Sequence, residues 1–187
     1  MMQWALELSR KRKARKAAVA AITPLVEASR QRLGGISDAT WSDPYIVGFL
    51  VMLISIMARM ESGRMSADAM CTVQWRAWED ITTLETNIIA EQLLHLSTER
   101  NRDFEQGCHN AAAFSSILFG TEMLPEGVGL ASLEGWVSKP DEDSANAFAQ
   151  REDVTAAWAQ FFDAHISCLR EMTHAQNDTG VNDTRPE

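Results

Sequence analysis

The chain has 187 residues, of which 45% are hydrophobic and 23% are charged, the usual composition of a soluble globular protein. Three cysteines are too few for a disulfide-dense scaffold, and ten glycines with five prolines argue against a many-turned β-sandwich. Six tryptophans, seven phenylalanines and nine methionines supply enough apolar volume for a core, which excludes a wholly disordered chain.

The charge is divided between two regions of opposite sign. Residues 1–32 contain eight Lys or Arg and two Asp or Glu, which gives +6. Residues 33–187 contain nine Lys or Arg and 24 Asp or Glu, which gives −15. Because the acidic body repels nucleic acid and anionic lipid, a contact with either would have to be made by the basic segment.

Residues 1–22 are predicted to form a basic helical arm, because they are rich in Ala, Leu, Lys and Arg. Residues 9–16 are polar on every side, so we expect them to lie outside the core. Three roles stay open: a docking arm for an acidic protein, a contact with nucleic acid or anionic membrane, or a solvated terminus. The basic residues of the arm are Arg10, Lys11, Arg12, Lys13, Arg15 and Lys16.

The order of apolar and basic residues at the start does not fit a secretory signal. Trp4, Leu6 and Leu8 precede the basic run, whereas a signal sequence places its apolar segment after the basic residues. The longest apolar run, 45–58, is shorter than the ~20 residues that span a membrane. We therefore expect a cytoplasmic protein with reduced cysteines.

Residues 44–62 are predicted to form the central helix of an all-α protein. Asp43 before Pro44 is a strong helix-start signal, and Gly63 lies at the end. The helix is apolar nearly all round, so we predict a homodimer that covers it and buries at least ~1,200 Å². One narrow stripe is not apolar, and it contains Gly48, Ser55, Arg59 and Ser62. We expect it to face either solvent or a close-packed neighbour, because the small side chains at 48 and 55 would let another backbone approach.

The domain around this helix is predicted to span residues 23–174. Its first helical piece begins at Thr23, because Pro24 breaks a helix interior, and it ends at Gly34-Gly35. Three later helices are predicted from apolar spacing, at 66–97, about 104–120 and about 142–174. The fold class is therefore an irregular all-α bundle of five to six helices.

Two stretches are predicted to lack helix. Glycine and proline crowd into residues 121–143, where apolar side chains can fix an ordered loop against the surface. Residues 175–187 are polar and are predicted to form a disordered tail. No repeat of domain length and no sustained heptad is present.

Several residue pairs have spacings that could bring two metal-ligating or catalytic side chains together. His165 and Cys168 lie three apart on the last helix and could be two metal ligands or a base and its nucleophile, but further ligands are scattered. Cys108 and His109 are adjacent, so their side chains diverge by about 100° on a helix. The remaining pair, Glu91 and His95, does not have the Glu-x-x-His spacing of di-iron bundles. We expect no metal and no cofactor.

No phosphate-binding loop, Cys-x-x-Cys pair or nucleophile elbow occurs in the sequence. The leading hypothesis is therefore a non-enzymatic interaction or regulatory module, which is homodimeric. The alternative is a small-molecule-binding or enzymatic helical domain with an apolar pocket. Its candidate lining residues are Trp75, Trp78, Trp158 and His165.

Overall fold

The computed structural model describes residues 2–84, 95–96, 98–120 and 151–179. Of these residues 88% are helical and none lies in a strand, which confirms the all-α class. In chain order the elements are α1 (Met2–Leu33), η1 (Asp38–Ser42), α2 (Pro44–Ser62), α3 (Ala67–Thr82), α5 (Arg102–Phe119), α7 (Glu152–Trp158), the π-helical turn η3 (Ala159–Asp163) and α8 (Ala164–Thr179). The predicted loop 121–143 lies outside the described residues.

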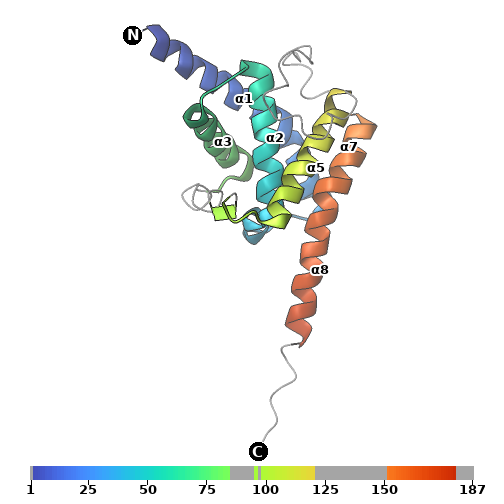
Figure 1. Ribbon diagram of the computed structural model, residues 1–187. Coiled ribbons are helices and arrows are strands. Elements are labelled where there is room, and N and C mark those ends of the chain that lie inside the picture. Colours follow the sequence, from blue (N-terminus) through green and yellow to red (C-terminus); the bar gives the residue numbers. More distant parts are fainter. Residues whose placement is uncertain (1, 85–94, 97, 121–150, 180–187) are drawn as a thin grey trace, which may run out of the picture.

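Helix α2 is the centre of the bundle, with α1, α3 and α5 packed around it (Figure 1). Its predicted bounds are confirmed: the Asp43 carboxylate accepts a hydrogen bond from the Ile46 amide at 3.1 Å, Pro44 occupies the first turn, and Gly63 ends the helix at φ 67°. It is the one described helix long and apolar enough to cross a membrane, but most of it is buried within the protein. This packing is typical of the core helix of a soluble protein.

The apolar surface of α2 is largely covered within one chain. Thirteen of its residues are buried, and α1, α3 and α5 pack against it. The homodimer stays a prediction. The predicted approach of a neighbouring backbone at Gly48 is confirmed, and the neighbour is α5. A β-carbon at Gly48 would lie 2.2 Å from the Phe104 carbonyl oxygen, and one at Gly107 would lie 2.1 Å from the Tyr45 carbonyl oxygen.

Helix α1 runs through Pro24, so the predicted start of a new helix at Thr23 is wrong. A proline inside a helix costs ~3 kcal/mol, but Ile22 and Leu25 on either side of it are buried on one continuous face. The prediction that residues 9–16 have no side chain in the core is also wrong, because Ala14 is fully buried.

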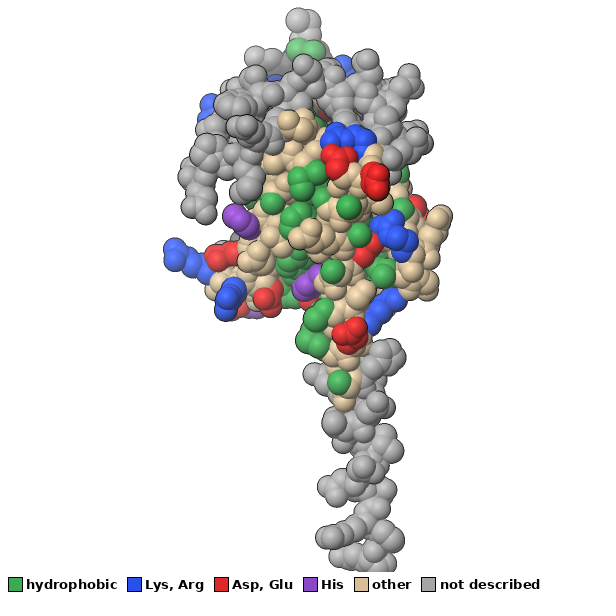
Figure 2. Space-filling view, turned by 90° about the vertical axis from the view of Figure 1, so that its right-hand side faces the viewer, with side chains coloured by type: hydrophobic (Ala, Val, Ile, Leu, Met, Phe, Trp, Pro, Cys, Tyr) green, Lys and Arg blue, Asp and Glu red, His purple; other side chains and the backbone are tan. Residues whose placement is uncertain are grey.

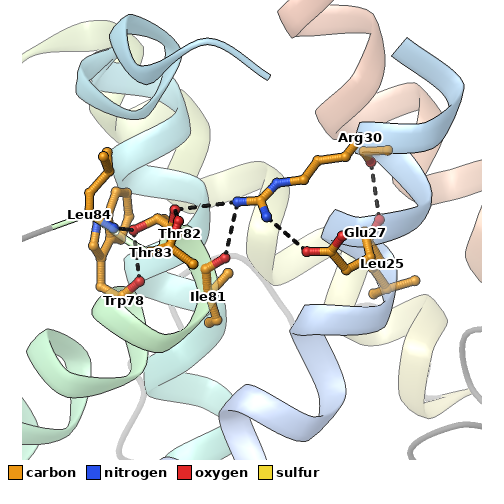
Figure 3. A network of polar contacts seen from close by, with 9 residues as sticks. Leu25, Glu27, Arg30, Trp78, Ile81, Thr82, Thr83 and Leu84 are labelled. Carbon is orange, nitrogen blue, oxygen red and sulfur yellow. Dashed lines mark hydrogen bonds and ion pairs between the residues drawn. The ribbon is translucent and has the colours of Figure 1, made fainter. Parts of the chain in front are cut away.

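Helix α3 begins after Ser66, as predicted, but it ends at Thr82 rather than near residue 97. Thr83 adopts a left-handed conformation (φ 65°), and the Thr82 hydroxyl accepts a hydrogen bond from the Leu84 amide at 3.3 Å. Arg30 of α1 donates to the carbonyl oxygens of Ile81 and Thr82 at this end of α3 (Figure 3). Residues 85–94 lie outside the described residues.

The predicted helix 142–174 is described only from residue 151 onward, because residues 142–150 lie outside the described part. Arg151 is extended (ψ 127°), so the described helix begins at Glu152, and it continues to Thr179 rather than ending near 174. It also contains the turn η3, in which the helix widens between α7 and α8. Part of the tail predicted for 175–187 is therefore helical, and residues 180–187 lie outside the described part.

The core contains large apolar side chains from α2, α3, α7 and α8. Leu50, Leu53, Ile54, Trp78, Ile81, Trp158 and Ile166 are buried, whereas Leu84 and Phe161 are only partly buried. Phe161 lies in the widened turn, where its position no longer follows the spacing of a regular helix.

Candidate functional site

The inward-facing basic residues of α1 hold this helix against its neighbours. Arg15 makes a two-point ion pair with Asp80 of α3, at 2.6 Å from each carboxylate oxygen. Arg10 donates to the carbonyl oxygens of Ser62 at 2.6 Å and of Arg64 at 3.0 Å, at the end of α2. These contacts fix the orientation of α1 about its own axis.

The outward-facing half of α1 is basic and has no acidic partner of its own. Arg12, Lys13 and Lys16 are exposed and make no hydrogen bond or ion pair within the described residues. At 100° per residue they fall within about 100° of the helix circumference. We call Arg12, Lys13 and Lys16 the cationic face of α1.

The residues of the predicted basic arm thus fall into three groups with different contacts. Arg10 and Arg15 bind the bundle, Lys11 forms a 3.5 Å ion pair with Glu7, and the other three form the cationic face. On the α7–α8 side of the molecule, by contrast, acidic and basic side chains are interspersed (Figure 2). A helix that is held in a fixed orientation and presents only positive charges can bind an anionic surface.

A second cluster surrounds His165 on α8. The His165 Nε2 lies 2.9 Å from Asp43 Oδ1, and its ring stacks on that of Tyr45 with the centroids 4.0 Å apart. The Tyr45 hydroxyl donates to the Phe161 carbonyl oxygen in η3 and accepts from the Asn110 amide, both at 2.8 Å. Burial raises the pKa of the Tyr45 phenol, and the nearby Asp43 charge adds to this, whereas the hydrogen bond from Asn110 opposes it.

This cluster contains a histidine–carboxylate pair, and among the described residues no hydrogen bond joins the histidine to a nucleophile. A nucleophile would have to lie within hydrogen-bond reach of the histidine. No hydrogen bond joins Cys168 to His165, and the Cys168 side chain is exposed. No group of three or more metal-ligating side chains occurs in the part of the chain that the structure describes. The cluster is best understood as a polar contact between α2, α5 and α8.

The four predicted pocket residues occupy three different environments. Trp158 packs edge-on against Phe49 and Phe114, and its Nε1 donates to Ser29 Oγ at 2.7 Å. Trp78 is buried on α3, whereas Trp75 on the same helix is 39% exposed. His165 belongs to the cluster described above.

Cys108 and His109 do not assemble into a site, and the pair of Glu91 and His95 is only partly described. Burial raises the pKa of the Cys108 thiol to about 11, and the thiol donates to the Gly48 carbonyl oxygen at 3.4 Å. The adjacent His109 is exposed. His95 lies 3.3 Å from Glu99, one helical turn away, and Glu91 lies outside the described residues.

One buried polar network has no counterpart among the sequence predictions. The Asp163 carboxylate in η3 accepts from the Ser29 hydroxyl and forms an ion pair with Arg32, at 2.7 Å. The Ser29 hydroxyl in turn accepts from Trp158. Because Ser29 and Asp163 are 134 residues apart, no local spacing could reveal their contact.

Comparisons with known proteins add no functional assignment. No protein-family model, no curated protein and no solved structure matches this chain. The functional argument therefore rests on the geometry of the described residues.

Proposed function

We propose that this protein is a non-enzymatic, cytoplasmic interaction module that binds an anionic partner through the cationic face of α1. The observation that supports the proposal is the division of the basic residues of α1. Arg10 and Arg15 fix the helix to α2 and α3, and this leaves Arg12, Lys13 and Lys16 exposed in a defined orientation. Preorganised charges lose less freedom on binding than charges on a frayed terminus.

The placement of the candidate pocket residues supports an interaction module over a small-molecule enzyme. Trp158 is surrounded by aromatic rings and Trp75 lies at the surface, so these two do not line a common cavity. The polar groups of the histidine cluster form hydrogen bonds that link separate helical segments. These contacts give both features a structural role.

Binding to fluorescein-labelled poly-L-glutamate, measured by fluorescence anisotropy, tests the proposal. We expect binding at low ionic strength that weakens at about 0.15 M salt. The variant Arg12→Glu/Lys13→Glu/Lys16→Glu should bind at least about tenfold more weakly, since exposed pairs contribute ~0.2–1 kcal/mol each. Its melting temperature should not change, because all three side chains are exposed.

A charge-matched variant provides the control. Arg64, Arg100 and Arg102 are exposed elsewhere on the surface, and replacing all three with Glu changes the net charge by the same amount. This control should lose much less affinity than the cationic-face variant. Equal weakening by the two variants, or no binding by the wild type, would contradict the proposal. Light scattering on the same samples reports whether the protein is the predicted homodimer.

A further inference from the structure

We infer that the anionic partner is a phospholipid bilayer, and that α1 contacts it with its exposed leucines as well as with its cationic face. This inference rests on the proposed function and makes it more specific. Leu6 and Leu8 are 59% and 53% exposed, and they lie about one to three turns before the three cations. Two of the four exposed large hydrophobic side chains of the described residues are therefore found together on this helix.

The leucines and the cations share the outward half of α1. Leu8, Arg12 and Lys16 follow one another at four-residue spacing and form one row along the helix. Leu6 and Lys13 are seven residues apart and form a second row. At 100° per residue, all five positions fall within about 160° of the circumference. The opposite side of the helix carries Ala14, which is buried in the bundle.

The leucines lie toward the N-terminal end of α1, which projects beyond the bundle (Figure 1). The cations lie closer to the bundle. A bilayer surface offers anionic headgroups and, just below them, an apolar region, so it can accommodate both kinds of side chain at once. A nucleic acid offers phosphates to the cations but no comparable apolar layer to the leucines.

The charge distribution of the chain favours contact through this end alone. The chain beyond residue 32 carries −15 and is repelled by an anionic membrane, whereas residues 1–32 carry +6. At physiological salt, electrostatic repulsion between the acidic body and the membrane is largely screened beyond about 8 Å. A projecting helix can therefore reach the surface while the acidic body stays in solution. Three cations near such a surface strengthen binding by about a hundredfold over a neutral membrane.

Flotation of the full-length protein with phosphatidylcholine vesicles, with and without phosphatidylserine, tests the inference. We expect binding only to vesicles that contain phosphatidylserine. Binding should be lost in Arg12→Glu/Lys13→Glu/Lys16→Glu and retained far better in Arg64→Glu/Arg100→Glu/Arg102→Glu. The variant Leu6→Ser/Leu8→Ser should bind these vesicles severalfold more weakly and bind poly-L-glutamate as the wild type does.

The outcomes separate this inference from the proposed function. Binding to poly-L-glutamate without binding to phosphatidylserine vesicles would overturn the bilayer and leave an acidic protein as the partner. Unchanged vesicle binding by Leu6→Ser/Leu8→Ser would overturn the role of the leucines, and with it the argument for lipid. Binding to neither probe would overturn both proposals. Circular dichroism of each variant verifies that the fold is retained.

Discussion

Helices α2 and α5 meet backbone to backbone, whereas α1 meets the π-turn η3 through polar side chains. At the first contact, Gly48 and Gly107 leave so little space that an added β-carbon would overlap a carbonyl oxygen of the other helix. At the second, Asp163 accepts from Ser29 and pairs with Arg32. The first contact requires that the two glycines have no side chain, whereas the second requires that each polar side chain has its partner.

The two contacts should therefore fail in different ways. A close glycine crossing tolerates no added atom, because the clashing groups belong to the backbone and cannot rotate away. In a buried polar network, a small change in side-chain shape costs less than the removal of one side chain. Removing one side chain takes a hydrogen-bond partner from each group that it contacted. Substitutions at each contact can test this difference directly.

The largest effect is expected for Gly107→Ala. The new β-carbon would lie 2.1 Å from the Tyr45 carbonyl oxygen and 2.8 Å from the Phe49 amide nitrogen, so the helices must separate. We expect the free energy of unfolding to fall by ~3 kcal/mol or more, although alanine has the better helix propensity by ~1 kcal/mol. Urea denaturation measures this change.

The neighbouring position on α5 provides the control. Gln106 is exposed, and Gln106→Ala should change the free energy of unfolding by no more than ~0.5 kcal/mol. If Gly107→Ala were as stable as the wild type, α2 and α5 could not cross at the distance described.

A smaller loss is expected for Asp163→Ala. Removing the carboxylate leaves the Ser29 hydroxyl with only the Leu25 carbonyl oxygen as an acceptor and Arg32 without its ion pair, which should cost ~2–3 kcal/mol. Because Arg32 is partly exposed, the loss should stay below that of a fully buried ion pair. Glu171→Ala, an exposed change on α8, is the control and should be nearly neutral.

A double-mutant cycle with Ser29→Ala sharpens this prediction. If the network acts as a unit, the losses of Ser29→Ala and Asp163→Ala should not add, and their coupling should be ~1 kcal/mol or more. Simple additivity would show that the two residues stabilise the fold independently.

The bounds of a helix could be predicted from the sequence where residues next to each end determine where it starts and stops. Helix α2 has the predicted bounds because Asp43 caps it, Pro44 fits its first turn and Gly63 adopts a positive φ at its end. The close approach at Gly48 was predictable because a small side chain on an apolar helix permits backbone contact. The approaching helix was not predictable, since the residues of α5 are some 60 positions away.

The errors arise where tertiary packing overrides a local signal. Pro24 is accommodated within α1 because buried side chains lie on both sides of it. Helix α3 ends at Thr82, where Arg30 of another helix binds the terminal carbonyl oxygens, although the apolar spacing of the sequence continues. The network of Ser29 and Asp163 and the stacking of His165 on Tyr45 join distant segments, and no spacing in the sequence reports them.

Tyr45 joins α2 both to α5 and to the π-turn η3, and its titration gives the smallest predicted effect. Its carbonyl oxygen faces Gly107, and its hydroxyl donates to the Phe161 carbonyl oxygen in η3. Because burial raises the pKa of the phenol in the folded chain, its contribution to stability is complete below about pH 10 and is lost as the pH rises through the folded value. Tyr45→Phe should cost ~1 kcal/mol at neutral pH through the lost hydrogen bonds, and this difference should shrink above pH ~10.

Tyr45 is the only tyrosine, so the tyrosinate absorbance of the wild type reports this one group. It should appear at higher pH in the folded protein than in urea, and identical titrations in the two states would show that Tyr45 does not link α2 to the π-turn as a buried phenol.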